Sequence, residues 1–182
     1  MRAHLALVSA ALVLTVAVSA DARSSTTTDS HLRPAEPSAN ALVADALDRS
    51  AVIRDLAAQL DRTDVVAYVR VVPHVDGGRP SSIHFLGRSP YTRYMVILVD
   101  EALTPDRQVA LVGHELQHAV DMAGADWITD SVRMAQYFSL CGWRLSDPDQ
   151  GFETLSALRT ERKVGQELAT VAAVASNRSR PR

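Results

Sequence analysis

Residues 111–120 read Leu-Val-Gly-His-Glu-Leu-Gln-His-Ala-Val, a stretch in which two histidines flank Glu-Leu-Gln. His114 and His118 are four residues apart, so on a helix their rings lie on one face, one turn apart, and can hold a single metal ion. Neutral imidazoles suit Zn²⁺. The Glu115 carboxylate reaches the same side as a metal-bound water and can take its proton as a general base. The stretch therefore predicts a helix that carries a zinc site.

The residues around this stretch indicate where the helix begins and ends. Thr104 is a suitable N-cap, Pro105 fits the first helical position, and Asp106 lies where the helix dipole favours an acid. Gly124, about five turns later, is a suitable terminator. We therefore expect one amphipathic helix over residues 104–124.

The rest of the chain is interpreted from its apolar periodicity. Helical spacing predicts a helix over residues 41–60, with a break near Ser50, and further helices over residues 130–141 and 152–175. β-branched and alternating residues predict strands over residues 65–72, 82–87 and 91–100. The order predicts an α+β fold: a small, mainly antiparallel sheet of about three strands, the motif helix and two further helices. Residues 41–175 form one expected domain.

This arrangement of a strand, a capped helix and His-Glu-x-x-His resembles the zincin metallopeptidases. The resemblance covers about residues 91–168 and implies that the strand before the helix lies along the cleft and pairs with the substrate backbone. It implies a peptide or protein substrate, hydrolysed with Zn²⁺ and with Glu115 as general base. The metzincin continuation needs Gly at 121 and His at 124, whereas this chain has Asp121 and Gly124. That subclass is excluded.

A third metal ligand is expected because catalytic zinc usually has three protein ligands. The other histidines, at positions 4, 31, 74 and 84, all precede the motif, so a carboxylate after it is favoured. Glu153 lies 35 residues past His118, in the first turn of the last predicted helix, with Ala157 four positions on. That order resembles the gluzincins, in a small single-domain bacterial form, and implies Glu153 as ligand. The alternatives are Asp130 and Asp126.

Other polar residues have less specific interpretations. Glu153 can instead be an acid that interacts with the helix dipole, and Asp130 a plain N-cap. Asp121, three residues after His118, can support a histidine ligand through a hydrogen bond. Tyr137, Arg159 and His84 are the candidates that can donate a hydrogen bond to a developing negative charge. The alternatives to an enzyme are an exported, non-catalytic metal-binding or interaction module on a zincin scaffold, and a motif that arose by coincidence.

The ends of the chain predict export. Residues 1–20 combine a basic start, an apolar run and small residues near position 20, the layout of a signal peptide. Residues 21–40 are rich in Ser, Thr and Pro and predict a flexible tether, and residues 176–182 a disordered basic tail. The mature protein is expected in the periplasm or outside the cell, with no stable membrane insertion. The net charge of −2 gives no reason to expect nucleic acid as a partner.

Overall fold

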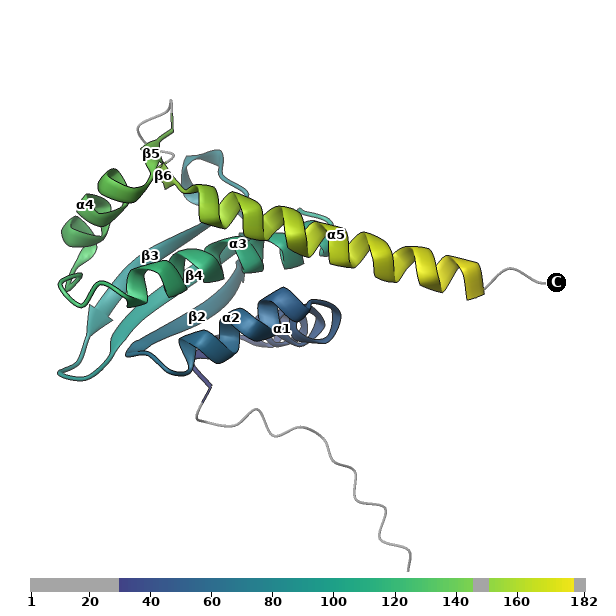
Figure 1. Ribbon diagram of the computed structural model, residues 1–182, viewed down its shortest axis with the longest axis horizontal. Helices are drawn as coiled ribbons and strands as arrows, with labels where there is room; N and C mark the ends of the chain where they lie inside the picture. The colour runs from purple at the N-terminus through teal and green to yellow at the C-terminus, as the bar shows by residue number, and fades with distance from the viewer. Residues whose placement is uncertain (1–29, 146–150, 179–182) are drawn as a thin grey trace, which may run out of the picture.

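The centre of the protein is a mixed four-stranded β-sheet, seen in a computed structural model that describes residues 30–145 and 151–178 (Figure 1). Its strands are β1 (Leu32–Pro34), β2 (Val65–Val72), β3 (Ser81–Arg88) and β4 (Arg93–Asp100), in the order β1-β2-β4-β3. β1 and β4 each pair parallel with β2, whereas β3 pairs antiparallel with β4. Among the strands of the described residues, β3 is therefore an edge strand that pairs on one side only.

Five helices complete the described part of the fold: α1 (Pro37–Arg49), α2 (Ala51–Leu60), α3 (Pro105–Ala123), α4 (Ser131–Cys141) and α5 (Leu155–Arg178). A 3₁₀ turn, η1 (Asp76–Gly78), precedes β3, and the two-residue strands β5 (Trp143–Arg144) and β6 (Phe152–Glu153) pair antiparallel between α4 and α5. In Figure 1, α1, α2 and α3 lie on one face of the sheet, α5 packs against α3, and α4 lies near β3.

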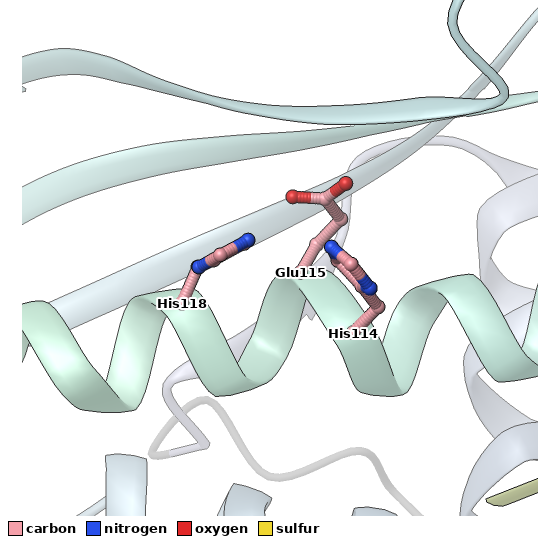
Figure 2. A group of neighbouring side chains, drawn as sticks. All are labelled: His114, Glu115 and His118. Atoms are coloured by element: carbon pink, nitrogen blue, oxygen red, sulfur yellow. The ribbon is translucent and has the colours of Figure 1, made fainter. Parts of the chain in front are cut away.

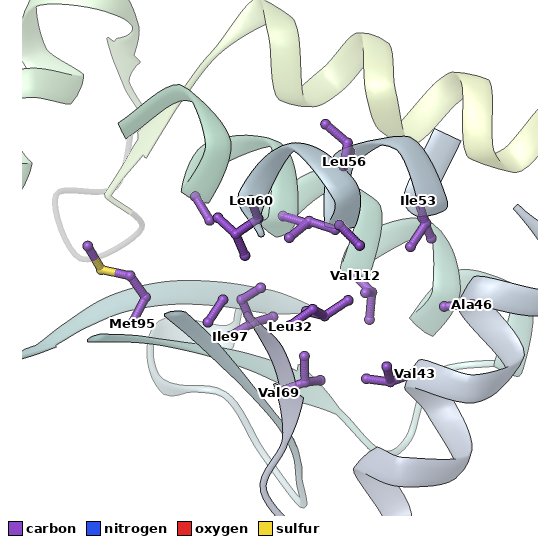
Figure 3. Packing of buried hydrophobic residues seen from close by; sticks show 14 of the residues in the cluster. Leu32, Val43, Ala46, Ile53, Leu56, Leu60, Val69, Met95, Ile97 and Val112 are labelled. Carbon is purple, nitrogen blue, oxygen red and sulfur yellow. The ribbon is translucent and has the colours of Figure 1, made fainter. Parts of the chain in front are cut away.

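The hydrophobic core fills the space between the sheet and the first three helices (Figure 3). Successive side chains of a strand point to opposite faces, so alternate residues of β2 and β4 face the helices. Burying each large aliphatic side chain contributes about 1.5–3 kcal/mol. The fully buried members from the strands are Val65, Ala67, Val69, Met95, Ile97 and Val99, and those from the helices include Ile53, Leu60, Val112 and Leu116.

The predicted helix boundaries are largely confirmed. Ser50 separates α1 from α2, and its hydroxyl accepts a hydrogen bond from the Ile53 amide at 3.1 Å, so it caps α2. α3 begins at Pro105 with Thr104 in the N-cap position, although the Thr104 side chain makes no capping hydrogen bond. It ends at Ala123 with Gly124 at the C-cap. The helix with the motif therefore has the predicted length and position.

A buried arginine fixes the end of α3 to the sheet. Arg93, at the start of β4, donates hydrogen bonds to the carbonyl oxygens of Met122, Ala123 and Ala125 at 3.2, 3.0 and 2.7 Å. It also pairs with both carboxylate oxygens of Asp64 at 2.8 and 2.6 Å. Carbonyls in the last turn of a helix have no partner within it, and a cation there is also favoured by the dipole. This contact sets the position of α3 along β4.

The α+β class is confirmed, but the prediction of a mainly antiparallel sheet of about three strands is wrong. The sheet has four strands, and two of its three pairings are parallel. β4 lies between β2 and β3. Alternation of apolar and polar residues predicts that a segment is a strand, but it does not predict which strands pair with it. The extra strand, β1, has only three residues, which is too short for a periodic signal.

The predicted tether is also wrong from residue 32 onward, because β1 and the start of α1 occupy it and Leu32 is buried. At the other end, α5 continues to Arg178, three residues into the predicted tail. The predicted signal peptide, residues 1–20, lies outside the described residues, as do residues 179–182. Within the described ranges, no helix combines the length and apolar character needed to cross a membrane.

Candidate metal centre

His114, Glu115 and His118 form a buried polar group in the middle of α3. Their exposed fractions are 6, 5 and 4%. Figure 2 shows the two imidazole rings and the carboxylate projecting from the same side of the helix, with ring centroids of the histidines 5.0 Å apart. One ligand atom from each residue lies within 4.8 Å of the others. The three residues predicted from the motif therefore come together in a cluster that can hold a metal ion.

Glu153 reaches this cluster from a different part of the chain. Its Oε1 lies 3.4 Å from Nε2 of His114 and 3.7 Å from Nε2 of His118. The same oxygen accepts a hydrogen bond from the backbone amide of Thr154 at 2.7 Å, which holds the carboxylate in place. Glu153 belongs to β6, two residues before α5, so the prediction that it lies in the first turn of the last helix is wrong. Glu153 nevertheless lies close to both histidines, as its predicted role requires.

The other ring nitrogen of His114 has an acidic partner that the sequence did not reveal. Nδ1 of His114 lies 2.9 Å from Oε2 of Glu161 on α5, and Glu161 also pairs with Arg107. These two partners lower the pKa of Glu161 to about 2, against the opposing effect of burial. With the proton on Nδ1, Nε2 keeps its lone pair and can bind a metal ion.

The pattern of α5 contained a signal for Glu161. Ala157, Val164 and Leu168 are buried and form an apolar stripe at helical spacing, and Glu161 stands within that stripe. An acid among apolar residues on one helix face needs a buried partner. The sequence does not identify that partner.

A chain of side-chain contacts supports His118. Oγ1 of Thr154 lies 3.4 Å from Nδ1 of His118 and 3.1 Å from Oγ of Ser156, which donates to Asp121 at 2.5 Å. Asp121 also accepts a hydrogen bond from Gln117 at 2.7 Å. The predicted support of a histidine by Asp121 is therefore indirect, because two hydroxyl groups stand between them.

Glu115 is held by a residue of the edge strand. The Ser81 hydroxyl, at the start of β3, donates a hydrogen bond to Oε1 of Glu115 at 2.6 Å, and both side chains are buried. This contact fixes the direction of the carboxylate. The strand that contributes it, β3, also borders the cleft above the cluster.

Burial sets the protonation of the cluster. It lowers the pKa of His118 to about 3, with the neighbouring His114 acting in the same direction, so His118 is neutral near pH 7. Burial also lowers the pKa of His114, but Glu161, Glu115 and Glu153 together raise it above its usual value. The pKa values of Glu115 and Glu153 are both raised, chiefly by burial. A neutral imidazole beside carboxylates is the donor set that divalent metals use.

A cleft of about 530 Å³ lies over the cluster. One wall is β3, and the other comes from α4, β6 and the start of α5. Phe85, Met134 and Phe138 contribute apolar surface, and Arg79 and Arg107 contribute cationic groups. The ring of Phe138 packs edge-on against His118, with centroids 5.0 Å apart. The cluster is thus at the bottom of a space that can admit an extended ligand.

The alternative ligands lie elsewhere. Asp130 accepts a hydrogen bond from the Arg133 amide at 2.8 Å and is the N-cap of α4, and Asp126 is exposed; neither lines the cleft. Of the three candidates for stabilising negative charge, only His84 lines the cleft. Tyr137 donates to the Asp121 carbonyl at 2.9 Å, and Arg159 is exposed.

Comparisons with protein-family models, with curated proteins and with solved structures find no match to this chain. Fold and site therefore define it only as an α+β protein with a buried His-Glu-His group that can hold a metal ion.

Proposed function

We propose that the protein is a zinc-dependent metallopeptidase of the zincin type. The observation that carries the proposal is the approach of Glu153 Oε1 to the Nε2 atoms of His114 and His118, at 3.4 and 3.7 Å. Ligands about 2.1 Å from a tetrahedral zinc ion are about 3.4 Å apart. The two distances from Glu153 thus match those between protein ligands of a zinc ion, and the three side chains that would hold it come from two separate segments.

Two carboxylates compete for the place of third ligand. Glu115 is in the same compact group as the histidines, but one of its oxygens is bound by Ser81. Glu153 lies close to both Nε2 atoms and has its Oε1 oriented by the backbone of Thr154. We assign Glu153 as the ligand and Glu115 as the general base. His114, Glu115, His118 and Glu153 then have the roles that the zincin resemblance implies.

The residues of the cleft support hydrolysis of an amide. Zinc, when bound, supplies Lewis acidity that polarises the scissile carbonyl and favours deprotonation of a water. Glu115 accepts the proton of the attacking water and returns it to the leaving amine, and its raised pKa suits a group that must do both. Glu161 keeps the His114 ring oriented, and Phe138 shields His118 from bulk water.

The substrate backbone is proposed to pair with β3. This strand has a free edge and borders the cleft, whereas β4, the strand directly before the motif helix, has neighbours on both sides. An extended peptide can add to such an edge through main-chain hydrogen bonds. β4, for which the zincin resemblance implied this role, has no unpaired edge. We further propose that the protein is exported, so that it meets its peptide substrates in the periplasm or outside the cell.

The test combines metal analysis with turnover. The purified chain should bind one zinc, His118→Ala should lose it, and Glu115→Gln should keep it while hydrolysis of a broad peptide library stops. Gln136→Ala serves as a control, because Gln136 is exposed on α4 and does not line the cleft. A Glu115→Gln protein that cleaves as fast as the parent would exclude the mechanism. Zinc binding without hydrolysis of any peptide would favour the non-catalytic module.

A further inference from the structure

The two ring nitrogens of His118 face different parts of the site. Nε2 lies 3.7 Å from Oε1 of Glu153, on the side where a metal ion would bind, and Nδ1 lies 3.4 Å from Oγ1 of Thr154. A neutral imidazole carries its proton on one of these nitrogens, and only the other has a lone pair for a metal. His118 can therefore serve as a zinc ligand through Nε2 only when its proton is on Nδ1.

The hydroxyl of Thr154 does not decide alone where that proton lies, because a hydroxyl both donates and accepts hydrogen bonds. Ser156 Oγ donates to Oδ2 of Asp121 at 2.5 Å, and this bond uses its only proton. In the contact of 3.1 Å between Ser156 and Thr154, Thr154 is therefore the donor. Toward His118, and toward the Ala157 amide at 3.3 Å, Thr154 then acts only as an acceptor.

Asp121 is the end of this chain of contacts that determines its direction. A carboxylate only accepts hydrogen bonds, and both oxygens of Asp121 do so. Oδ2 accepts from Ser156, and Oδ1 accepts from Nε2 of Gln117 at 2.7 Å. The Gln117 amide is oriented in turn by the buried Thr160, whose hydroxyl donates to Oε1 of Gln117 at 2.8 Å. Every proton in the chain is thus directed away from His118 and toward Asp121.

We propose that Asp121 is a positioning residue, which holds the proton of His118 on Nδ1 through the two hydroxyl groups and so leaves Nε2 free to bind zinc. His114 has the same arrangement by direct contact with a carboxylate, since its Nδ1 lies 2.9 Å from Oε2 of Glu161. The proposal rests on the part of the proposed function that makes His118 a zinc ligand. It does not depend on hydrolysis of a peptide.

The tautomer of His118 can be measured by NMR on the metal-free full chain with ¹⁵N in its histidine rings. A protonated and an unprotonated ring nitrogen have well-separated ¹⁵N chemical shifts, and the signals of His118 are those lost in His118→Gln. At about pH 8, where imidazoles are neutral, the parent protein should carry the His118 proton on Nδ1. A parent protein with that proton on Nε2 would overturn the proposal.

Asp121→Asn tests the direction of the chain without a change of size. Gln117 donates to the Oδ1 position, so the amide oxygen of Asn is favoured there and its NH₂ group faces Ser156. Each hydroxyl then donates to the next group, and the proton of His118 moves to Nε2. The variant should also bind zinc about 10-fold more weakly in competition with a chelator. Asp55→Asn removes the same charge from an exposed position on α2 and should change neither property.

Ser156 provides a second test that keeps Asp121 in place. Ser156→Ala breaks the chain, so Thr154 is free to donate to His118, and we expect a mixture of the two tautomers and weaker zinc binding. Ser156→Thr keeps a hydroxyl and should behave as the parent does. If either Asp121→Asn or Ser156→Ala kept the tautomer of the parent, the proposal would fail even with weaker zinc binding, because the residue would then act only on packing.

The NMR measurement and the peptidase assay can fail independently. A chain whose His118 tautomer depends on Asp121 but which hydrolyses no peptide would retain the positioning role and exclude the peptidase. A chain that hydrolyses peptides but has the same tautomer in Asp121→Asn would retain the peptidase and exclude the positioning role. Failure of both measurements would exclude the two together.

Discussion

Gly142 is the position where one added methyl group should disturb the proposed zinc site without touching a ligand side chain. It is the C-cap of α4 and packs directly on the backbone of Glu153. Its φ of −131° is open to any residue, so Gly142→Ala introduces no backbone strain of its own. The added Cβ would instead overlap the carbonyl oxygen of Glu153 and approach that of Phe138 to 3.1 Å.

The size of the effect follows from this overlap. Restoring an ordinary contact requires the Glu153 backbone to retreat by about 1 Å. This shift disturbs the pairing of Trp143 with Glu153 and moves Oε1 away from the two Nε2 atoms, now 3.4 and 3.7 Å distant. Overpacking of this kind costs about 1–3 kcal/mol of stability. A displaced ligand should weaken zinc binding by about 10- to 100-fold, as loss of supporting contacts does elsewhere.

The assay is a competition for zinc with a chelator of known affinity, together with thermal unfolding followed by circular dichroism. Gly124→Ala is the matched control, because Gly124 is the C-cap of α3, has a φ of −70°, and would place its Cβ 3.8 Å from the nearest atom. It should leave zinc affinity unchanged. A Gly142→Ala protein that is less stable but binds zinc as tightly as the parent would show that Glu153 is not a ligand.

Further predictions concern residues outside the motif. Glu161→Gln should lower zinc affinity by about 10- to 100-fold in the same competition assay, because it weakens the acceptor that orients His114; unchanged affinity would exclude that support. Arg93→Met should reduce the free energy of unfolding in urea by about 1–3 kcal/mol, because carbonyl oxygens at the end of α3 lose their donor while the half-exposed Asp64 can be solvated; an unchanged free energy of unfolding would refute it. Arg93 lowers the pKa of Asp64, so the stability from this pair should be present above pH ~4 and lost as the pH falls further. Asp64→Asn should flatten that acid dependence.

The sequence predicted the parts of the site that depend on local spacing. His114 and His118 are one helical turn apart wherever the helix packs, and Pro105 and Gly124 mark its ends without reference to other elements. The position of Glu153 near the cluster was also anticipated, although its secondary structure was not. β6 has only two residues, which give no period to detect.

The parts that the sequence did not reveal depend on contacts between distant segments. Glu161 stands 47 positions after His114, and only the docking of α5 on α3 makes them partners. The parallel pairing of β1 with β2 likewise depends on a strand of only three residues. Leu32 is the one buried residue of that strand. Neither the Glu161–His114 contact nor the β1–β2 pairing can be predicted from the apolar pattern of the sequence. Such a pattern indicates which face of an element is buried, but not which element covers that face.

The approach of α5 to α3 joins the stability of the fold to the geometry of the site. Gly113, next to the first histidine, lets the helices come close: a Cβ there would lie 2.9 Å from Cγ2 of Val164. Val164 is one turn beyond Glu161 on the same face of α5, so any separation of the helices at Gly113 also draws Glu161 away from His114. A core contact that would ordinarily affect only stability therefore also governs the orientation of a metal ligand. Residue 113 cannot be enlarged without changing both, which explains the need for glycine beside His114.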